Sequence, residues 1–274
     1  MNKRVIRKRI EWFFRLFIPN KVVKADISYL SPNNRLLGKK IIITGGNKGI
    51  GYAMARKFVA EGASVLICGR DEDSLKIVGR ELSCPYLVLD VLNTEEFPEF
   101  INKADKILGG ANVLVNNAGI SLHEGDISHV SEQGFDNQIN TNLKGCYFLS
   151  KAFLADFEKR KSGGILFVSS ERGRYVDDIP YGLTKAAINS LVQGLAFTNS
   201  SKHIKINAVA PGVTATKLTG RSEDNLYSSK GIGRIYLSDE VAEVACFLIS
   251  DVSNCISGQI IYCDNGNSVN SYKR

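Results

Sequence analysis

Short apolar runs alternate with segments in which apolar residues recur every third or fourth position, from residue 39 almost to the end of the chain. The short runs are typical of buried strands, and the longer periodic segments are typical of helices. The predicted strands are Lys40–Thr44, Ser64–Cys68, Tyr86–Leu89, Val113–Asn116, Ile165–Ser169, Ile204–Val209 and Gln259–Tyr262. The predicted helices are Gly49–Glu61, Glu72–Leu82, Glu95–Leu108, a long stretch from Ser131 to Lys159 with or without an interruption, Tyr181–Ser200 and Asp239–Ile249.

Nearly all-apolar strands that alternate with helices indicate a parallel sheet covered on both faces. The predicted fold class is therefore α/β, with a Rossmann-like, doubly wound, seven-stranded parallel sheet. The chain has 274 residues and shows no internal repeat or second domain boundary. We expect one domain at residues 39–274, preceded by an N-terminal extension and connector at residues 1–38.

The N-terminal extension differs from the rest of the chain in charge. Residues 1–38 hold nine Lys or Arg and two acids, which accounts for the whole formal net charge of +7, and residues 39–274 sum to zero. A basic arm on a neutral body does not indicate a nucleic-acid-binding domain, so no nucleic-acid partner is expected. Within residues 1–20, apolar positions at helical spacing predict a short basic amphipathic helix that Pro19 ends. Such a helix either lies on an anionic membrane surface or packs on the protein itself or on a sister subunit.

The cysteines and histidines give no sign of a metal or disulfide framework. None of the six cysteines forms a C-x-x-C pair, and most lie in apolar runs, so we expect reduced thiols in a cytoplasmic protein. His123, His129 and His203 are dispersed and fit no metal-ligand spacing, so no metal is expected. No apolar run approaches the length of about 20 residues that a membrane-spanning helix needs.

A glycine-rich loop joins the first predicted strand to the first predicted helix, with the sequence Thr44-Gly45-Gly46-Asn47-Lys48-Gly49-Ile50-Gly51. Glycines permit a tight turn and let backbone N–H groups approach a pyrophosphate at the helix N-terminus. The position after a strand and before a helix separates a dinucleotide site from an ordinary turn. The candidate cofactor-binding residues of this loop are Gly45, Asn47, Lys48, Gly49, Ile50 and Gly51.

The G-x-x-x-G-x-G spacing of this loop resembles that of the short-chain dehydrogenase/reductase family. Further segments similar to that family follow in the same order: Asp90-Val91, Asn116-Asn117-Ala118-Gly119, Asn142-Leu143-Lys144-Gly145, Ser169-Ser170, Tyr181-Gly182-Leu183-Thr184-Lys185, Pro211-Gly212 and Ser257-Gly258-Gln259. The resemblance covers residues 39–266 and is greatest to the 3-oxoacyl-acyl-carrier-protein reductases. It implies a nicotinamide-dependent oxidoreductase that interconverts a carbonyl and a secondary alcohol.

The end of the second predicted strand indicates which nicotinamide cofactor binds. An acid there accepts a hydrogen bond from the 2′-hydroxyl of NAD, whereas a cation accommodates a 2′-phosphate. The strand ends at Arg70, and Lys48 lies in the adjacent loop, so NADP(H) is favoured over NAD(H). The alternative is that Arg70 pairs with Asp71 or Asp73 at the surface.

The resemblance implies further cofactor contacts. Asp90 and Val91 resemble the pair that contacts the adenine, and Asn116, Asn117, Ala118 and Gly119 resemble the segment under the adenine ribose. Val213 and Thr214, just after Pro211 and Gly212, offer backbone to the nicotinamide carboxamide, and Thr216 lies near the pyrophosphate.

Tyr181 and Lys185 are four positions apart on a predicted helix and therefore share one face. A neighbouring ammonium stabilises a phenolate, so we expect Lys185 to lower the pKa of Tyr181 and make it a general acid or base. By the resemblance, Tyr181 protonates the carbonyl oxygen, Lys185 also binds the nicotinamide ribose, and Ser170 hydrogen-bonds the same oxygen. Asn142 holds a water that links Lys185 to solvent, or else bonds backbone inside its helix.

The serine has an alternative. Tyr181 follows Ser170 after 11 positions, about two fewer than is usual in the family, and the segment between them is unusually charged. Ser169 is therefore kept beside Ser170 as the candidate.

The substrate is left open by the sequence. By the resemblance, the segment from Lys217 to Ile235 is the substrate lid, and it is polar and basic. Arg172 and Arg174 lie on the other side of the predicted cleft, and His123 is a further candidate for lining it. These charges fit a 3-oxoacyl thioester on an acidic carrier protein or a sugar, polyol or nucleotide-sugar substrate. A non-catalytic dinucleotide-binding sensor or scaffold is the alternative of another class. The last strand and the helix before it are apolar, and similar members of the family pair these elements across subunits, so the resemblance implies a homodimer or homotetramer.

Overall fold

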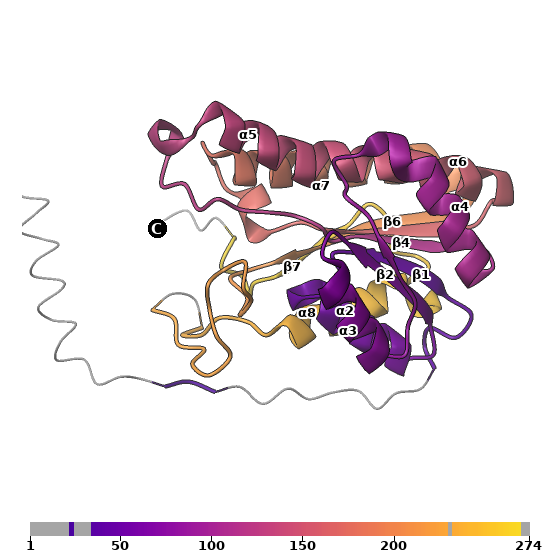
Figure 1. The fold of residues 1–274 in the computed structure, drawn as a ribbon. Helices are drawn as coiled ribbons and strands as arrows, with labels where there is room; N and C mark the ends of the chain where they lie inside the picture. Colours follow the sequence, from indigo (N-terminus) through magenta and orange to yellow (C-terminus); the bar gives the residue numbers. More distant parts are fainter. Residues whose placement is uncertain (1–21, 25–33, 230–231, 270–274) are drawn as a thin grey trace, which may run out of the picture.

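The computed structural model describes residues 22–24, 34–229 and 232–269, and its centre is a seven-stranded parallel sheet (Figure 1). The strands are β1 (Lys40–Thr44), β2 (Ser64–Gly69), β3 (Tyr86–Val88), β4 (Val113–Asn116), β5 (Gly163–Val168), β6 (Ile204–Pro211) and β7 (Ile260–Cys263). Their order across the sheet is β3-β2-β1-β4-β5-β6-β7. This order confirms the predicted fold class, and its reversal between β1 and β4 marks the crevice where such sheets bind ligands.

Helices cover both faces of the sheet (Figure 1). One face carries α2 (Gly49–Ala60), α3 (Glu72–Glu81) and α8 (Ser238–Ile249), and the other carries α4 (Phe97–Leu108), α5 (Glu132–Ile139), α6 (Cys146–Arg160) and α7 (Pro180–Asn199). Each interface has its own apolar core, with Phe58 and Met54 in one and Phe153, Phe157 and Phe167 in the other. Because both faces of the strands are buried, the strand sequences are apolar throughout instead of alternating.

The long helix predicted from Ser131 to Lys159 is interrupted at its middle. After α5 a π-helical segment, η3 (Asn140–Gly145), leads into α6. Gly145 is required at the end of this segment, since a Cβ there would lie 2.6 Å from the carbonyl oxygen of Val91. The π-helical segment therefore packs backbone to backbone against the chain that follows β3, and such segments are frequent at functional sites.

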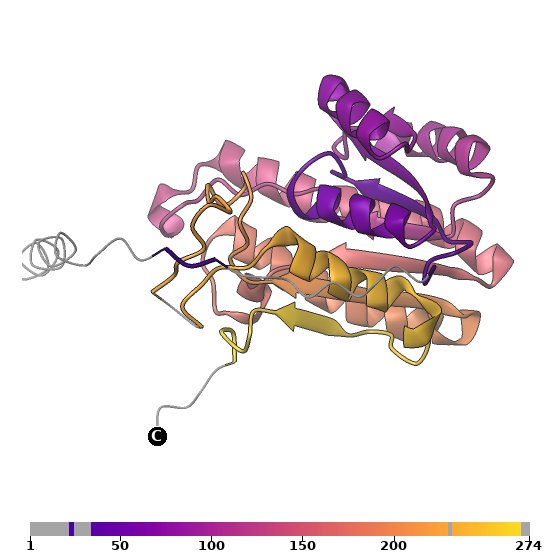
Figure 2. The ribbon, with the colours of Figure 1, turned by 90° about the horizontal axis from the view of Figure 1, so that it is seen from below.

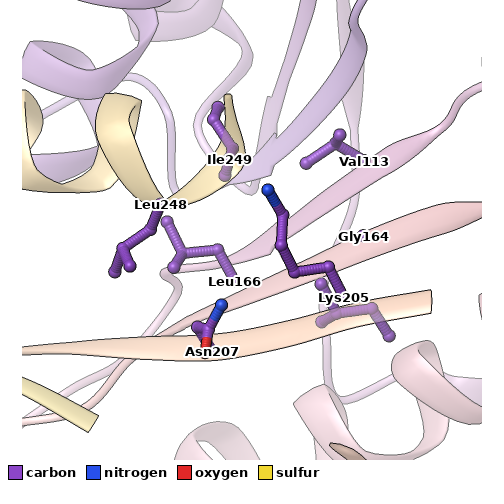
Figure 3. Close-up of a pocket in the computed structure, with 8 residues that line it drawn as sticks. Val113, Gly164, Leu166, Lys205, Asn207, Leu248 and Ile249 are labelled. Atoms are coloured by element: carbon purple, nitrogen blue, oxygen red, sulfur yellow. The ribbon is translucent and has the colours of Figure 1, made fainter. Parts of the chain in front are cut away.

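The amino-terminal edge of the sheet, opposite the crevice, holds a cavity of about 10 Å³ that is lined by Val113, Leu166, Lys205 and Ile249 among others (Figure 3). This volume is of the order needed for one water molecule. The Lys205 ammonium donates to the Ser250 carbonyl (2.6 Å), to Ser253 Oγ (2.9 Å) and to Asn254 Oδ1 (3.3 Å). Burial lowers the pKa of Lys205 to about 8. These contacts fasten the end of α8 to β6, so we assign this edge a structural role.

Among the described residues, no helix is long and apolar enough to cross a membrane. The amphipathic helix predicted for residues 1–20 lies outside the described residues.

Candidate active site

The loops that follow β1 and β4 are joined to each other at the carboxyl edge of the sheet. Thr44 Oγ1 accepts hydrogen bonds from the backbone N–H groups of Asn117 and Ala118, both at 3.0 Å. The Asn117 side chain donates in return to the carbonyl oxygens of Thr44 (2.8 Å) and Gly45 (3.0 Å). Asn117, in the loop after β4, thus holds the start of the glycine loop in place through its side chain.

The glycine loop has the shape of an anion cradle. Gly45 and Gly49 have φ of +65° and +53°, and a Cβ on Gly51 would lie 2.2 Å from the Gly45 carbonyl oxygen. No side chain in the described part of the chain caps the N-terminus of α2, so its first N–H groups face the loop without a side-chain acceptor. Thr216 reaches this point from the segment after β6, because a Cβ on Gly49 would lie 3.3 Å from its methyl group. These residues fit the pyrophosphate of a dinucleotide.

Two cations are exposed near the glycine loop, Lys48 in the loop itself and Arg70 directly after β2. The structure shows no ion pair between Arg70 and either Asp71 or Asp73 within the described residues. Asp71 instead accepts from the Ser74 backbone N–H (3.1 Å) and caps α3. Arg70 and Lys48 are therefore available for an anionic group beside the cradle.

The residues that the sequence analysis predicts at the adenine lie in the chain after β3 and at the start of the turn after β4. Asp90 Oδ1 accepts from the Leu92 backbone N–H (3.0 Å), which shapes this turn, and Val91 is buried against Gly145. Asn116 behaves differently from its neighbours, since its side chain donates to Ser150 Oγ (2.9 Å) in α6. Asn116 therefore joins β4 to α6 through its side chain.

Asn142 lies in the π-helical segment and clamps the turn after β4. Its Nδ2 donates to the Ile120 carbonyl (2.9 Å), and its Oδ1 accepts from the Ile120 backbone N–H (2.8 Å). A Cβ on Gly119 would lie 3.3 Å from Asn142 Oδ1 and 3.8 Å from the Lys185 ammonium. The structure thus brings Asn142 Oδ1 and the Lys185 ammonium to the same side of Gly119, with Asn142 bonded to backbone.

Tyr181 and Lys185 face each other from the first turns of α7, which begins with Pro180 at its N-terminus, where proline is tolerated. The Lys185 ammonium is 5.5 Å from the centre of the Tyr181 ring. It donates to the Val168 carbonyl at the end of β5 across 2.8 Å. The side chain is buried, and burial lowers the pKa of Lys185 to about 8.

The pKa of Tyr181 departs from the expectation of a lowered value. It is raised, and the largest cause is burial of the phenol, while a hydrogen bond with Ser170 and the charge of Arg172 lower it and the charge of Glu171 raises it. The prediction of a lowered pKa for Tyr181 is wrong, because desolvation outweighs the surrounding charges.

The two serines at the end of β5 point to different partners. Ser169 Oγ donates to Asn189 Oδ1 (2.6 Å) and to the Lys185 carbonyl (3.3 Å), so its hydroxyl is directed at α7. Ser170 Oγ accepts from the Arg172 backbone N–H (3.2 Å), and the Ser170 side chain acts to lower the pKa of Tyr181. The geometry therefore places Ser170, and not Ser169, beside the phenol.

Sequence reasoning missed Asn189, which organises this corner. Besides holding Ser169, its Nδ2 donates to the Gly173 carbonyl (3.1 Å) and to the Tyr262 hydroxyl (3.3 Å). Its position one helical turn after Lys185 was the available signal.

Much of the charge in the short segment between Ser170 and Tyr181 is engaged internally. Arg172 donates to Asp177 at 2.5 Å, and the Arg174 guanidinium lies 5.2 Å from the centre of the Tyr262 ring. Both arginines are candidates for substrate contact from their position in the sequence. Their contacts show that they also brace this segment.

The lid after β6 is fastened at three places. His123 Nε2 is 2.7 Å from the Leu218 carbonyl, and Ala215, Leu226 and Ile235 form a small apolar core within the lid. Residues 22–24 of the N-terminal extension lie along the lid (Figures 1 and 2). The Leu226 backbone N–H donates to the Val23 carbonyl (3.0 Å), and the Val23 N–H donates to Asn225 Oδ1 (3.2 Å).

Comparisons with known proteins find similar sequences and structures. Residues 45–268 match the family model described as enoyl-(acyl carrier protein) reductase. The 3-oxoacyl-acyl-carrier-protein reductase FabG of Chlamydia muridarum is 32% identical over 246 residues, which cover 85% of this chain and 99% of the relative.

Two solved structures are similar along nearly their whole length. ElxO with bound NADP has a TM-score of 0.77 and 35% identity, with 84% of this chain and 98% of ElxO covered. A 3-ketoacyl-(acyl-carrier-protein) reductase from Brucella melitensis in complex with NADH has a TM-score of 0.80 and 28% identity, with 85% of this chain and 100% of that chain covered. The family match begins at residue 45, after the N-terminal extension.

Proposed function

The chain belongs to the short-chain dehydrogenase/reductase family, and from that premise we propose that it reduces a 3-oxoacyl thioester to the 3-hydroxyacyl thioester at the expense of NADPH. As a member of the family it is an NAD(P)-dependent oxidoreductase that interconverts a carbonyl and an alcohol. The observation that carries the proposal is the arrangement of Tyr181, Lys185 and Ser170 at the carboxyl edge of the sheet, beside a glycine cradle.

Each residue of this group has its own role in the proposed reaction. When bound, NADPH supplies the hydride that reduces the carbonyl carbon. Tyr181 donates its phenolic proton to the carbonyl oxygen, and Ser170 donates a hydrogen bond to the same oxygen as negative charge develops on it. Lys185, held by the Val168 carbonyl, supplies the positive charge that favours the phenolate left behind. Asn142 keeps the turn at Ile120 and Gly119 in place beside this ammonium.

The choice of NADPH over NADH rests on Lys48 and Arg70. Both are exposed beside the cradle, and Asp71, the acid next to Arg70, is directed into the cap of α3. A 2′-phosphate carries close to two negative charges and binds guanidinium and ammonium groups strongly. Bound NADP in ElxO supports the choice, and bound NADH in the Brucella melitensis protein makes the cofactor comparison a necessary control.

The substrate class is tested by comparing cofactor oxidation on different carbonyl compounds. The purified full-length chain is mixed with NADPH or NADH and with an acetoacetyl thioester, and the loss of reduced-cofactor absorbance is measured. A parallel panel of keto-sugars and sugar lactones tests the sugar and polyol alternative. Turnover of the thioester with NADPH supports the proposal. Turnover only on the sugar panel, or binding of NADPH without any turnover, contradicts it.

We further propose that the enzyme is cytoplasmic and forms a homodimer or homotetramer. We also propose that residues 1–20 make a peripheral contact with the membrane. Large apolar side chains are exposed on α6 and α7, among them Tyr147, Phe148, Leu183 and Phe197, which is the kind of surface that subunits cover. Light scattering after size-exclusion chromatography measures the subunit number. Co-sedimentation of the intact chain with phosphatidylglycerol vesicles, and its loss when residues 1–20 are deleted, tests the membrane contact.

A further inference from the structure

A buried carboxylate lies directly after Ser170. Glu171 is only 6% exposed although it is charged, and it begins the short 3-10 turn η4 (Glu171–Arg174) that Ser170 caps. A buried carboxylate is costly unless hydrogen bonds or opposite charges compensate for it. The contacts of Glu171 therefore indicate what this carboxylate does.

One partner of Glu171 comes from the end of the chain and the other from four residues further along its own segment. Asn267 Nδ2 donates to Glu171 Oε2 (2.8 Å), and the Tyr175 hydroxyl donates to the same oxygen (3.3 Å). Asn267 Nδ2 also lies 3.1 Å from the Tyr175 hydroxyl, which closes a triangle of three side chains. We call Glu171, Tyr175 and Asn267 the latch.

The turn that carries Asn267 is itself rigidly built. It follows β7, and Asp264, which is 2% exposed, accepts from the backbone N–H groups of Gly266 (3.0 Å) and Ser268 (2.8 Å). The Asn267 N–H donates to the Asp264 carbonyl (3.0 Å). The latch therefore connects the segment that follows Ser170 to the rigid turn after β7.

We propose that Glu171 is a positioning residue for the carbonyl reduction, which fastens Ser170 to the Asp264–Ser268 turn through Asn267 and so sets the distance between Ser170 and Tyr181. The segment from Ser170 to Tyr181 is short and connects the end of β5 to the first turn of α7. Arg172–Asp177 braces its far half, and the latch holds its near half. The proposal rests on the proposed function, because it assigns Glu171 a role through Ser170 in that reaction.

The charge of Glu171 provides a readout that a purely structural contact would not give. The groups that face Tyr181 are Ser170 and Arg172, which lower its pKa, Glu171, which raises it, and Lys185, which lies 5.5 Å from the ring centre. Removal of the Glu171 charge lowers the pKa of Tyr181. Since Tyr181 must be protonated to donate in the reductive direction, the high-pH limit of kcat then moves to lower pH.

Glu171→Gln and Asn267→Ala separate charge from fastening. Glu171→Gln keeps the shape and an acceptor for Asn267, so we expect a small loss of kcat and a high-pH limit at lower pH. Asn267→Ala keeps the charge and removes the main donor, so we expect a kcat about tenfold lower, because a small misplacement of a catalytic group is costly. NADPH affinity stays at the wild-type value in both variants, since the cradle is built from other loops. Val269→Ala is the matched control, because Val269 lies beside the turn but is 56% exposed and outside the latch.

The outcomes separate the latch from the proposed function. If the wild type binds NADPH but shows no turnover, the proposed function is overturned. The latch is then tested by a spectroscopic titration of Tyr181 in the wild type and in Glu171→Gln. In each protein, the Tyr181 signal is the difference from the same protein with Tyr181→Phe added. A Tyr181 pKa unchanged by Glu171→Gln, together with a kcat for Asn267→Ala equal to that of Val269→Ala, overturns the latch. If Asn267→Ala does not fold, which the loss of NADPH binding would reveal, the pH profile of kcat for Glu171→Gln decides alone whether the latch acts on Tyr181.

Discussion

The Lys185 ammonium donates to the Val168 carbonyl across 2.8 Å, which ties the helix that carries the phenol to the last residue of the strand that leads into the serines. Lys185 is therefore a structural link as well as a charge. Its burial lowers its pKa to about 8 from the usual 10.5, so the native fold holds this ammonium at an energetic cost.

The cost of Lys185 predicts how stability depends on pH. Between a pKa of about 8 in the native state and 10.5 in the unfolded chain, the unfolded chain binds more protons, so the free energy of unfolding rises with pH across this window. The full difference corresponds to about 3 kcal/mol as an order of magnitude. Urea unfolding of Lys185→Met at several pH values from 7 to 10 should show a flatter rise than the wild type, together with loss of activity.

Lys205 has a lowered pKa in the same window, so the wild type does not isolate Lys185. The difference between wild type and Lys185→Met at each pH removes the Lys205 contribution. Parallel stability curves for the two proteins would contradict the assignment of a strongly lowered pKa to Lys185.

Tyr181→Phe removes the proposed proton donor and leaves the ring. General acid catalysis typically contributes about 10² to 10⁴ in rate, so kcat should fall by a factor in that range. The NADPH dissociation constant should change little, because the cradle and Arg70 are unaltered. Steady-state kinetics and NADPH fluorescence titration measure both quantities. A kcat within about threefold of the wild type would remove Tyr181 from the mechanism, since general acid catalysis is worth far more than that.

Ser169→Ala and Ser170→Ala should fail in different ways. Ser170 lies beside the phenol, and loss of one donor to a developing oxyanion typically costs about 10² to 10³ in kcat. Ser169 is bonded to Asn189, so its removal leaves a buried acceptor and lowers the free energy of unfolding by about 1–3 kcal/mol. Kinetics and urea unfolding are measured on both variants. Full activity in Ser170→Ala would make Ser169 the catalytic candidate.

Arg70→Asp should change the cofactor preference. The substitution removes a cation from the expected 2′-phosphate position and introduces an acceptor for the 2′-hydroxyl of NAD. Charge-assisted hydrogen bonds of this kind are worth about 1.5–3 kcal/mol, so the dissociation constant of NADPH should rise by about 10- to 100-fold. Arg80→Asp, which is exposed on α3, is the control for the same change of charge. Equal NADPH constants in the two variants would show that Arg70 does not bind the phosphate.

The sequence predicted the sheet, the helices and the crevice well because burial on both faces makes the strands apolar throughout. It also predicted that Tyr181 and Lys185 share a helix face, since that follows from helical spacing alone. The pKa of Tyr181 was missed because desolvation depends on how closely other elements pack over the phenol. The roles of Asn116 and Asn117 are also invisible in the sequence, because adjacent residues on an extended segment point in opposite directions. The latch joins residues 96 positions apart and has no local signature.

The contact between Val23 and the lid predicts a role for the N-terminal extension in substrate binding. The Val23 N–H donates to Asn225 Oδ1, and the Leu226 N–H donates to the Val23 carbonyl, so the extension holds the lid from outside. Val23→Pro removes the N–H and keeps the carbonyl, and one lost hydrogen bond of about 1 kcal/mol should raise KM for the carbonyl substrate several-fold while the NADPH constant stays unchanged. Val22→Pro is the neighbouring control, because Val22 is 58% exposed. If the two proline variants show the same KM as the wild type, the lid does not depend on this contact, and the extension serves a purpose unrelated to substrate binding.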